Sequence, residues 1–318
     1  MTEEKDYKIV KGNEGREPIS SFRQTANCFS AYEINPALGC DFGCTYCSMY
    51  AQEEDMAHQP VKIFSDYPEY LRDAISHLKA EGIRPTFNFT PKSDVLMPSL
   101  IDSGVTQKIL DILTETESRF YMITKGGVPP EDVQERIYKA KDLGQIILSA
   151  GLPDEKYRMR LEPNAPSIEQ RMELGRFCTE NGIRAAGIVA PFLPGMGEDY
   201  KEGITKRYRS AGVDHLSIHI MKVSEHCLER MAGILGDRIK EAYTESESID
   251  WGLPGGRRVK RFYANPEIMK NELYDFKSLA EDKGMTVSVC KDVMRLIGDN
   301  HFNSGASRRG ITCVGFRR

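Results

Sequence analysis

Short apolar runs alternate with amphipathic helical stretches along most of this chain, and this alternation restricts its possible folds more than any other feature. Such alternation is typical of βα units, which place parallel strands in one sheet with helices on its outer face. The pattern predicts strands near Tyr32–Asn35, Thr86–Phe89, Phe120–Ile123, Ile146–Ser149, Ala185–Ala190 and His215–Ile220. It predicts helices near Tyr67–Glu81, Val105–Thr114, Pro130–Leu143, Ser167–Asn181 and Asp199–Ala211. Six such units form an α/β fold, a partial (β/α)6 barrel of the TIM type, in which functional groups gather at the carboxyl ends of the strands.

The same pattern divides the 318 residues into three parts. Residues 1–30 are expected to be a polar leader, and residues 31–224 to form the barrel. Residues 225–318 are expected to be a C-terminal extension that caps the barrel and shapes its pocket. In this extension the sequence predicts a helix from Glu225 to about Glu245, a helix near Pro266–Lys283 and a strand at Thr286–Val289.

Composition argues against two broad classes of protein. No apolar stretch approaches the ~20 residues that cross a bilayer, so no contact with a membrane is expected. The start, Met1-Thr-Glu-Glu-Lys-Asp6, lacks a secretory signal pattern, and the cytoplasm is the expected location. The formal net charge of −4 gives no overall attraction to nucleic acid, whose binding proteins usually have basic surfaces.

Three cysteines, Cys40, Cys44 and Cys47, follow the first predicted strand with C-x3-C-x2-C spacing. Three thiolates on one short loop can bind three irons of a [4Fe–4S] cluster. The fourth iron then has no protein ligand and is open to a small molecule. A structural zinc site is disfavoured, because it normally has four ligands and the chain has no second C-x2-C pair. Disulfides are also disfavoured, since eight cysteines without a secretory leader indicate a reducing compartment.

Tyr46, directly before the third cysteine, completes a motif that resembles the radical S-adenosylmethionine (SAM) superfamily. In that superfamily the open iron binds the amino and carboxylate groups of SAM. The reduced cluster cleaves SAM to a 5′-deoxyadenosyl radical, which abstracts hydrogen from a C–H bond. Residues 32–220 further resemble the spore photoproduct lyase-like group. The segments that carry this likeness are Asn35-Pro36, Gly39-Cys40, Ser93-Asp94, Thr124-Lys125, Leu148-Ser149, Arg160–Pro166 and Val189–Gly195.

The resemblance implies two cofactors, a [4Fe–4S] cluster on the three cysteines and SAM on the strand ends. Ser93 and Asp94 would contact the methionine amino group of SAM. Lys125 would pair with the SAM carboxylate as a point charge matched to an anion. A reductant such as flavodoxin or ferredoxin would be the protein partner.

The adenosine end of SAM would be held by three further residues. The resemblance implies that Tyr46 offers its backbone to the adenine and that Ser149 binds the ribose. The main chain of Ala190 would line the adenine. Taken singly, a serine or lysine at a strand end is more often a capping or solvated residue. The placement of these residues at successive strand ends favours the binding role.

One departure from the group bears on the substrate. Members that repair DNA carry a hydrogen-donating cysteine two residues before the position of Ser93. Here that position is Pro91, followed by Lys92, and neither has a transferable hydrogen. We therefore expect a small-molecule substrate, sugar- or nucleoside-like, as in natural-product biosynthesis. A DNA-lesion lyase and a non-catalytic Fe–S or zinc-binding module are the alternatives.

Three residues are candidates for substrate chemistry. Glu33 lies near the end of the first strand, where alternation can point it into the barrel, and a buried carboxylate needs a partner. His219 shares a strand face with His215 and lies nearer the catalytic rim, where imidazole can act as acid or base. A satisfied core histidine is the competing interpretation. Cys227 is the first candidate for a pocket thiol that returns hydrogen to a product radical, and Cys313 is the second.

Two charged segments remain open to two interpretations. The cluster Arg257-Arg-Val-Lys-Arg261 could hold a phosphate or carboxylate of the substrate through its guanidinium groups, or could be solvated surface. Glu162, after the fourth strand, is expected either to fix its loop by hydrogen bonds or to reach the substrate.

Overall fold

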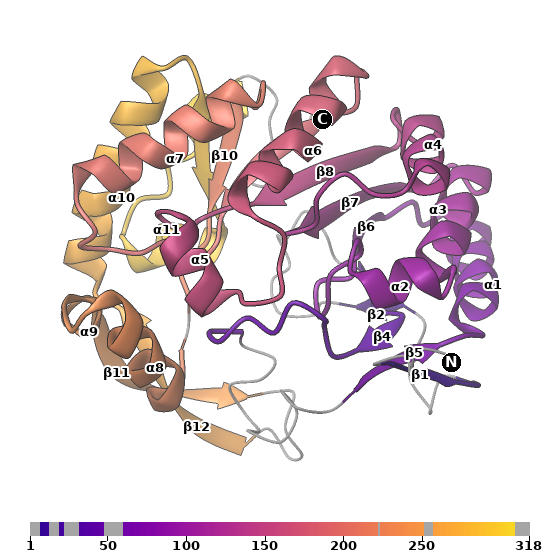
Figure 1. Ribbon diagram of the computed structural model, residues 1–318, viewed down its shortest axis with the longest axis horizontal. Helices are drawn as coiled ribbons and strands as arrows, with labels where there is room; N and C mark the ends of the chain where they lie inside the picture. The colour runs from indigo at the N-terminus through magenta and orange to yellow at the C-terminus, as the bar shows by residue number, and fades with distance from the viewer. Residues whose placement is uncertain are drawn as a thin grey trace.

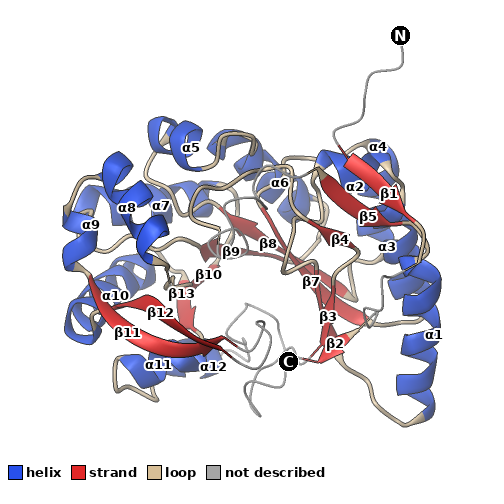
Figure 2. Ribbon diagram, turned by 90° about the horizontal axis from the view of Figure 1, so that it is seen from below, coloured by secondary structure: helices blue, strands red, loops and turns tan. Residues whose placement is uncertain are grey.

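The computed structural model describes residues 7–12, 19–21, 32–47, 60–221, 223–250 and 257–308. An eight-stranded sheet in the order β13-β10-β9-β8-β7-β6-β3-β2 forms the centre of the molecule. The sheet is curved, and helices cover its outer face (Figure 1, Figure 2). The expected α/β fold with a parallel sheet of partial-barrel type is therefore confirmed.

Six strands of this sheet are the parallel strands that the sequence predicts. They are β3 (Tyr32–Ile34), β6 (Thr86–Phe89), β7 (Arg119–Thr124), β8 (Gly144–Ser149), β9 (Ala185–Val189) and β10 (His215–Ile218). Adjacent strands among these six pair in parallel, as Phe87 of β6 does with Phe120 of β7 and Leu148 of β8 with Gly187 of β9. All six residues of β8 are buried, because helices cover one face of the sheet and the barrel interior covers the other.

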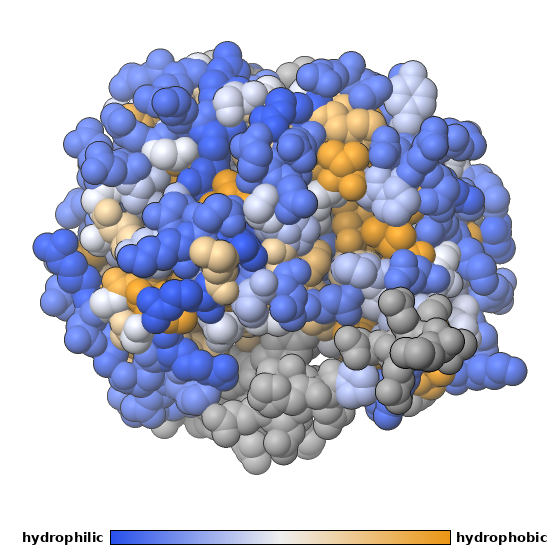
Figure 3. Space-filling view, in the orientation of Figure 1, coloured by the Kyte–Doolittle hydropathy of each residue, from blue (hydrophilic) through white to orange (hydrophobic). Residues whose placement is uncertain are grey.

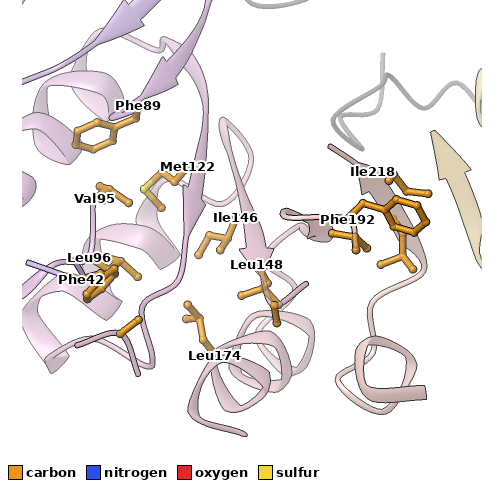
Figure 4. Packing of buried hydrophobic residues seen from close by; sticks show 14 of the residues in the cluster. Phe42, Phe89, Val95, Leu96, Met122, Ile146, Leu148, Leu174, Phe192 and Ile218 are labelled. Carbon is orange, nitrogen blue, oxygen red and sulfur yellow. The ribbon is translucent and has the colours of Figure 1, made fainter. Parts of the chain in front are cut away.

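Helices between the strands pack their apolar faces on the outer side of the sheet. They are α1 (Tyr67–Ala80), α2 (Pro98–Asp102), α3 (Val105–Glu115), α4 (Glu131–Lys139), α5 (Glu155–Leu161), α6 (Ile168–Glu180) and α7 (Glu198–Ser210). A capping box between Ser167 and Gln170 begins α6. Leu174 of α6 points toward Leu148 of β8, and both side chains are fully buried (Figure 4).

Strand alternation separates the buried side chains into two sets. Outward-facing residues such as Met122 and Leu148 join the large core between sheet and helices (Figure 4). A second cluster, formed by Tyr121, Ile147, Ala186 and Ile188, lies on the opposite, inner face. Because the side-chain period of a strand is two residues, this inner face continues toward the strand ends with Ile123, Ser149 and Ala190.

The C-terminal part contains the predicted strand β13 (Thr286–Val289), which pairs in parallel with β10 and adds a seventh parallel strand to the barrel sheet. The predicted helix from Glu225 to about Glu245 is interrupted at Gly236 and ends at Glu241. Helices α8 (Glu225–Leu235) and α9 (Arg238–Glu241) are followed by an antiparallel ribbon of β11 (Tyr243–Asp250) and β12 (Arg257–Ala264). The remaining helices are α10 (Pro266–Asp282), α11 (Lys291–Leu296) and α12 (Ser304–Arg308).

A small three-stranded sheet lies beside the first strand of the barrel. In it, β1 (Tyr7–Val10), from the segment predicted as a leader, pairs in parallel with β5 (Val61–Phe64). Strand β4 (Ala37–Leu38) pairs antiparallel with β5, and β2 (Ser20–Ser21) pairs antiparallel with β3 at the edge of the main sheet. The small sheet thus supports the chain directly before Cys40. Cys313 lies outside the described residues. No helix in the described part of the chain has the length and apolarity needed to cross a membrane.

Candidate active site

The three cysteines lie on a loop directly after β4, and three neighbouring segments hold this loop in place. Asp41 accepts hydrogen bonds from the backbone N–H and the hydroxyl of Ser99, at 2.8 and 3.0 Å. The backbone N–H of Thr45 donates to the carbonyl oxygen of Leu161 at 2.9 Å. Asn164 Nδ2 donates to the carbonyl oxygen of Asp41 at 3.0 Å. Gly43 has a φ of 57°, which favours glycine at this turn. The loop is therefore fixed by contacts from α2, α5 and the segment after α5.

The thiols of this loop fit the donor set of an iron–sulfur cluster. Burial raises the pKa of Cys40, and Asp94, Cys44 and Cys47 raise it further through their charges, which places the three thiols within electrostatic reach. Burial also raises the pKa of Cys44, to about 12. Bound iron would have to displace these protons. Among the described residues, no three His, Cys, Asp or Glu side chains lie at metal-ligand spacing around one point.

Asp94 organises the carboxyl ends of β6 and β7 from a buried position. Its Oδ1 accepts hydrogen bonds from the Thr124 hydroxyl at 2.6 Å and from the backbone N–H of Leu96 at 3.0 Å. Its Oδ2 accepts from the backbone N–H of Lys125 at 2.7 Å. Burial raises the pKa of Asp94, and these hydrogen bonds oppose the increase. The carboxylate thereby fixes the backbone of the residue expected to bind the SAM carboxylate.

Two polar groups beside Asp94 lack a hydrogen-bond or anionic partner among the described residues. Ser93 Oγ is buried and has no hydrogen-bond partner among the described residues. Lys125 is half-buried, and its ammonium group forms no ion pair at salt-bridge distance with any described carboxylate. Burial opposes the charge of Lys125, but Cys44 and Glu162 outweigh it and leave its pKa above the ordinary value. A hydroxyl oxygen without a hydrogen-bond partner and a cation without an anionic partner fit the ammonium and carboxylate groups of an amino acid.

Two of the three residues implied for the adenosine end of SAM, Ser149 and Ala190, lie side by side. Ser149 ends β8 and Ala190 directly follows β9, and the Ser149 hydroxyl donates to the Ala190 carbonyl oxygen at 3.2 Å. Tyr46 is 8% exposed and lies under Lys125, whose Nζ is 5.7 Å from the centroid of its ring. The structure therefore brings the predicted SAM residues to the carboxyl ends of neighbouring strands, while their contacts with SAM stay a prediction.

Glu33 lies on the inner wall of the barrel among other polar groups. It is 7% exposed, its Oε2 accepts from Asn35 Nδ2 at 3.3 Å, and it is in register with Asn88 of β6. Asn88 Oδ1 and Thr90 Oγ1 are buried without a hydrogen-bond partner among the described residues. This part of the wall presents polar atoms that a polar ligand would satisfy.

The two histidines of β10 have different surroundings. His215 is a satisfied core residue, with Nδ1 2.8 Å from Thr286 Oγ1 and Nε2 3.0 Å from Ser288 Oγ. His219, directly beyond the strand, has an accessible side chain, and the surrounding protein lowers its pKa by desolvation. Its backbone N–H donates to the Val189 carbonyl at 3.1 Å, which places it beside the end of β9. Of the two histidines, only His219 lies at the carboxyl end of the strands, where a catalytic residue is expected.

Cys227 lies against the cysteine loop and not in an open pocket. It is 2% exposed, and its thiol donates to the carbonyl oxygen of Thr45 over 3.8 Å. Its role as a hydrogen donor stays a prediction. The basic cluster lies on β12, where Lys260 forms a 2.9 Å ion pair with Glu245 on β11. Both side chains are exposed, so this ion pair lies on the surface.

Arg171 was missed by the sequence analysis, although a signal for it exists. It lies on the buried stripe of α6 with Ile168, Met172, Gly175 and Cys178. A charged residue at an apolar position of an amphipathic helix needs a buried partner. Here that partner is Glu162, whose Oε2 lies 2.5 Å from Arg171 Nη2. Glu162 therefore fixes its loop, which was one of its two expected roles.

A cavity of about 410 Å³ opens on the outer side of the cysteine loop. Figure 3 shows hydrophobic side chains on this face, in the region between α6 and α2. Phe42, Leu96, Ile101 and Val128 are among its lining residues, and none of the residues predicted to bind SAM belongs to the lining. The cavity is thus separate from the strand ends of the candidate site.

Comparison with known proteins agrees with this geometry. The chain is 24% identical to uncharacterized protein ORF301 of Acidianus two-tailed virus, over 66% of this chain and 73% of that protein. It is 23% identical to uncharacterized protein MJ0683 of Methanocaldococcus jannaschii, over 63% of this chain and 75% of the relative.

Solved structures show the same fold. A spore photoproduct lyase mutant with bound AdoMet and dinucleoside spore photoproduct superposes with a TM-score of 0.63 and 16% identity, over 88% of this chain and 81% of the other. The radical SAM methyltransferase TsrM of Kitasatospora setae gives a TM-score of 0.55 and 13% identity, over 90% and 59%. Residues 34–206, more than half of the chain, match the radical SAM superfamily. The chain belongs to the radical SAM superfamily.

Proposed function

We propose that this radical SAM enzyme abstracts hydrogen from a sugar- or nucleoside-like small molecule. The observation that supports this substrate class is the polar inner wall formed by Glu33, Asn88 and Thr90. Buried polar atoms without partners cost free energy, and hydroxyl or amide groups of a substrate would satisfy them. His219 at the rim adds a further polar contact.

In this proposal, residues at the carboxyl ends of the strands bind and orient SAM. Lys125 pairs with the carboxylate of SAM, and Ser93 Oγ accepts a hydrogen bond from its amino group. Ser149 and the Ala190 main chain hold the adenosine end. When bound, the [4Fe–4S] cluster and SAM supply the 5′-deoxyadenosyl radical that takes hydrogen from the substrate.

The choice of a small molecule over a DNA lesion rests on Pro91 and on charge. Pro91 occupies the turn directly after β6, where a repair enzyme of the group would carry its hydrogen-donating cysteine. The net charge of −4 provides no general attraction to the phosphate backbone. The likeness to spore photoproduct lyase, at 16% identity, concerns the fold.

The family chemistry is tested on protein reconstituted with iron and sulfide under anaerobic conditions. The wild type should hold about four irons per chain and should release 5′-deoxyadenosine from SAM after reduction. Replacement of Cys40, Cys44 and Cys47 by Ala should abolish both. Cys178→Ala is the matched control, because Cys178 is a fully buried cysteine on α6, outside the loop. Retention of four irons in the triple variant would contradict the assignment.

The substrate class is tested with the same reconstituted enzyme. Incubation with nucleosides and nucleotide sugars should accelerate formation of 5′-deoxyadenosine and give a modified product. A spore photoproduct dinucleotide should stay unchanged. Conversion of that dinucleotide to two thymidines would contradict the proposed small-molecule substrate class and favour repair of a DNA lesion.

A further inference from the structure

Tyr46 lies between a cation on one side and a buried ion pair on the other. Its ring faces the Lys125 ammonium, with 5.7 Å between Nζ and the ring centroid, within the range of a cation–π contact. Its hydroxyl donates a hydrogen bond to Glu162 Oε1, 116 residues further along the chain. The side chain of Tyr46 thus contacts both Lys125 and Glu162.

The ion pair behind Tyr46 is fully enclosed. Glu162 and Arg171 side chains are 0% exposed, and Glu162 Oε2 lies 2.5 Å from Arg171 Nη2. Arg171 is fixed further by Nη1, which donates to the Ser149 carbonyl at 2.9 Å, and by Nε, which donates to the Pro166 carbonyl at 3.0 Å. These two backbone hydrogen bonds hold the guanidinium beside the carboxylate of Glu162, with which Nη2 forms the ion pair.

Burial of two charges is costly, and a hydrophobic pair of similar volume usually gives equal or greater stability. The ion pair is therefore poorly explained by stability alone. What it does provide is a fixed acceptor for the Tyr46 hydroxyl and, through the ring, a fixed surface beneath Lys125. A lysine side chain has four rotatable bonds, and holding its head in place reduces the entropy lost when an anion binds.

We propose that Arg171, Glu162 and Tyr46 are positioning residues that hold the Lys125 ammonium where the SAM carboxylate binds. The proposal rests on the proposed function, since it requires Lys125 to bind that carboxylate. Asp94 fixes the backbone of Lys125 by accepting its N–H at 2.7 Å, and the Tyr46 ring fixes the other end of the side chain. The same arginine also holds the Ser149 carbonyl, so one guanidinium links the positions for both ends of SAM.

The test measures the dissociation constant of SAM on reconstituted protein, with iron content determined for each variant. Lys125→Ala should weaken SAM binding by roughly 10- to 150-fold, as expected for loss of a charge-assisted bond. Tyr46→Leu, which removes the ring, should weaken it by about 3- to 30-fold. Tyr46→Phe and Glu162→Gln, which keep shape but release the ring, should have smaller effects of the same sign. All four should retain about four irons per chain.

Two control variants separate positioning from general loss of packing. Tyr243→Phe removes a buried hydroxyl that has no hydrogen-bond partner among the described residues, and SAM affinity should stay at the wild-type value. Glu272→Gln removes a carboxylate that pairs with Lys201 at 2.7 Å between α10 and α7. It should lower the melting temperature without changing the affinity for SAM.

The decisive comparison is the double variant Tyr46→Leu with Lys125→Ala. If Tyr46 acts through Lys125, the double variant should bind SAM no more weakly than Lys125→Ala alone. If the loss of SAM affinity in the double variant equals the product of the two single losses, the proposal is wrong. Loss of iron from Tyr46→Phe would also overturn it. Wild-type protein that holds a cluster but does not bind SAM would instead overturn the proposed function, so the two failures are distinguishable.

Discussion

His215 is held in its neutral form by its position inside the barrel. Burial lowers its pKa to about 4, and hydroxyl groups of Thr286 and Ser288 lie at its two ring nitrogens. In the unfolded chain a histidine titrates near pH 6.5, so between about pH 6.5 and 4 the unfolded state binds more protons. We therefore expect His215 to contribute to the free energy of unfolding above this range and to lose that contribution as the pH falls through it. The expected loss between pH 7 and pH 5 is roughly 2 kcal/mol.

The measurement is urea unfolding of the apoprotein at both pH values, with His215→Gln as the non-titrating control. The wild type should lose about 2 kcal/mol more than the variant over this interval, if burial alone keeps the imidazole neutral. Equal losses would show that other groups cause the pH dependence.

Residues whose position follows from a strand could be found in the sequence, whereas residues defined by distant contacts could not. Ser93, Lys125 and Ser149 each follow or end a strand with a clear apolar pattern, so their common edge was predictable. The contact between Tyr46 and Glu162 joins residues 116 positions apart, and no local pattern contains it. Cys227 and Thr45, which also contact each other, are 182 positions apart in the sequence.

At the scale of elements, the close approach of β9 to its neighbours leaves no space for a side chain at Gly187. A Cβ there would lie 2.5 Å from Leu216 Cδ2 and 2.7 Å from the ring of Tyr208. Gly187→Ala should therefore destabilise the protein by about 1–3 kcal/mol, because backbone or core side chains must move. Gly203→Ala on α7 meets nothing within 4 Å and should stabilise by up to about 1 kcal/mol.

Both effects are measured by denaturant unfolding of the apoprotein. A Gly187→Ala variant as stable as the wild type would show that the strand can shift at no cost. That result would contradict the expected destabilisation.

The ribbon of β11 and β12 and the short helices α2 and α5 escaped prediction for physical reasons. The ribbon of β11 and β12 has the sequence Tyr243-Thr-Glu-Ser-Glu-Ser-Ile-Asp250 in its first strand, which has no continuous apolar face. Its pairing instead brings charges together across the ribbon, as in Lys260 and Glu245. The helices α2 and α5, with 5 and 7 residues, are too short for a 3.6-residue period to be visible.

At the scale of the whole molecule, the acidic balance bears on nucleic-acid binding. A chain with net charge −4 has no general excess of cations to release counterions from DNA. We expect fluorescence anisotropy with a labelled duplex to give a dissociation constant no tighter than about 10⁻⁴ M at physiological salt. Lys260→Glu on the exposed ribbon should leave the result unchanged. A dissociation constant near or below about 1 µM would argue for a nucleic-acid substrate.

The pairing of β13 with β10 also affects how the protein is made. Thr286 of β13 lies opposite His215 of β10, and 71 positions separate them. At a synthesis rate of 5–20 residues per second, a ribosome needs roughly 4–14 s to add that stretch. During this interval the nascent chain carries β10 as an open edge, the kind of edge that pairs with other chains. Slower translation between the codons for β10 and β13 would lengthen the time for which this edge stays unpaired.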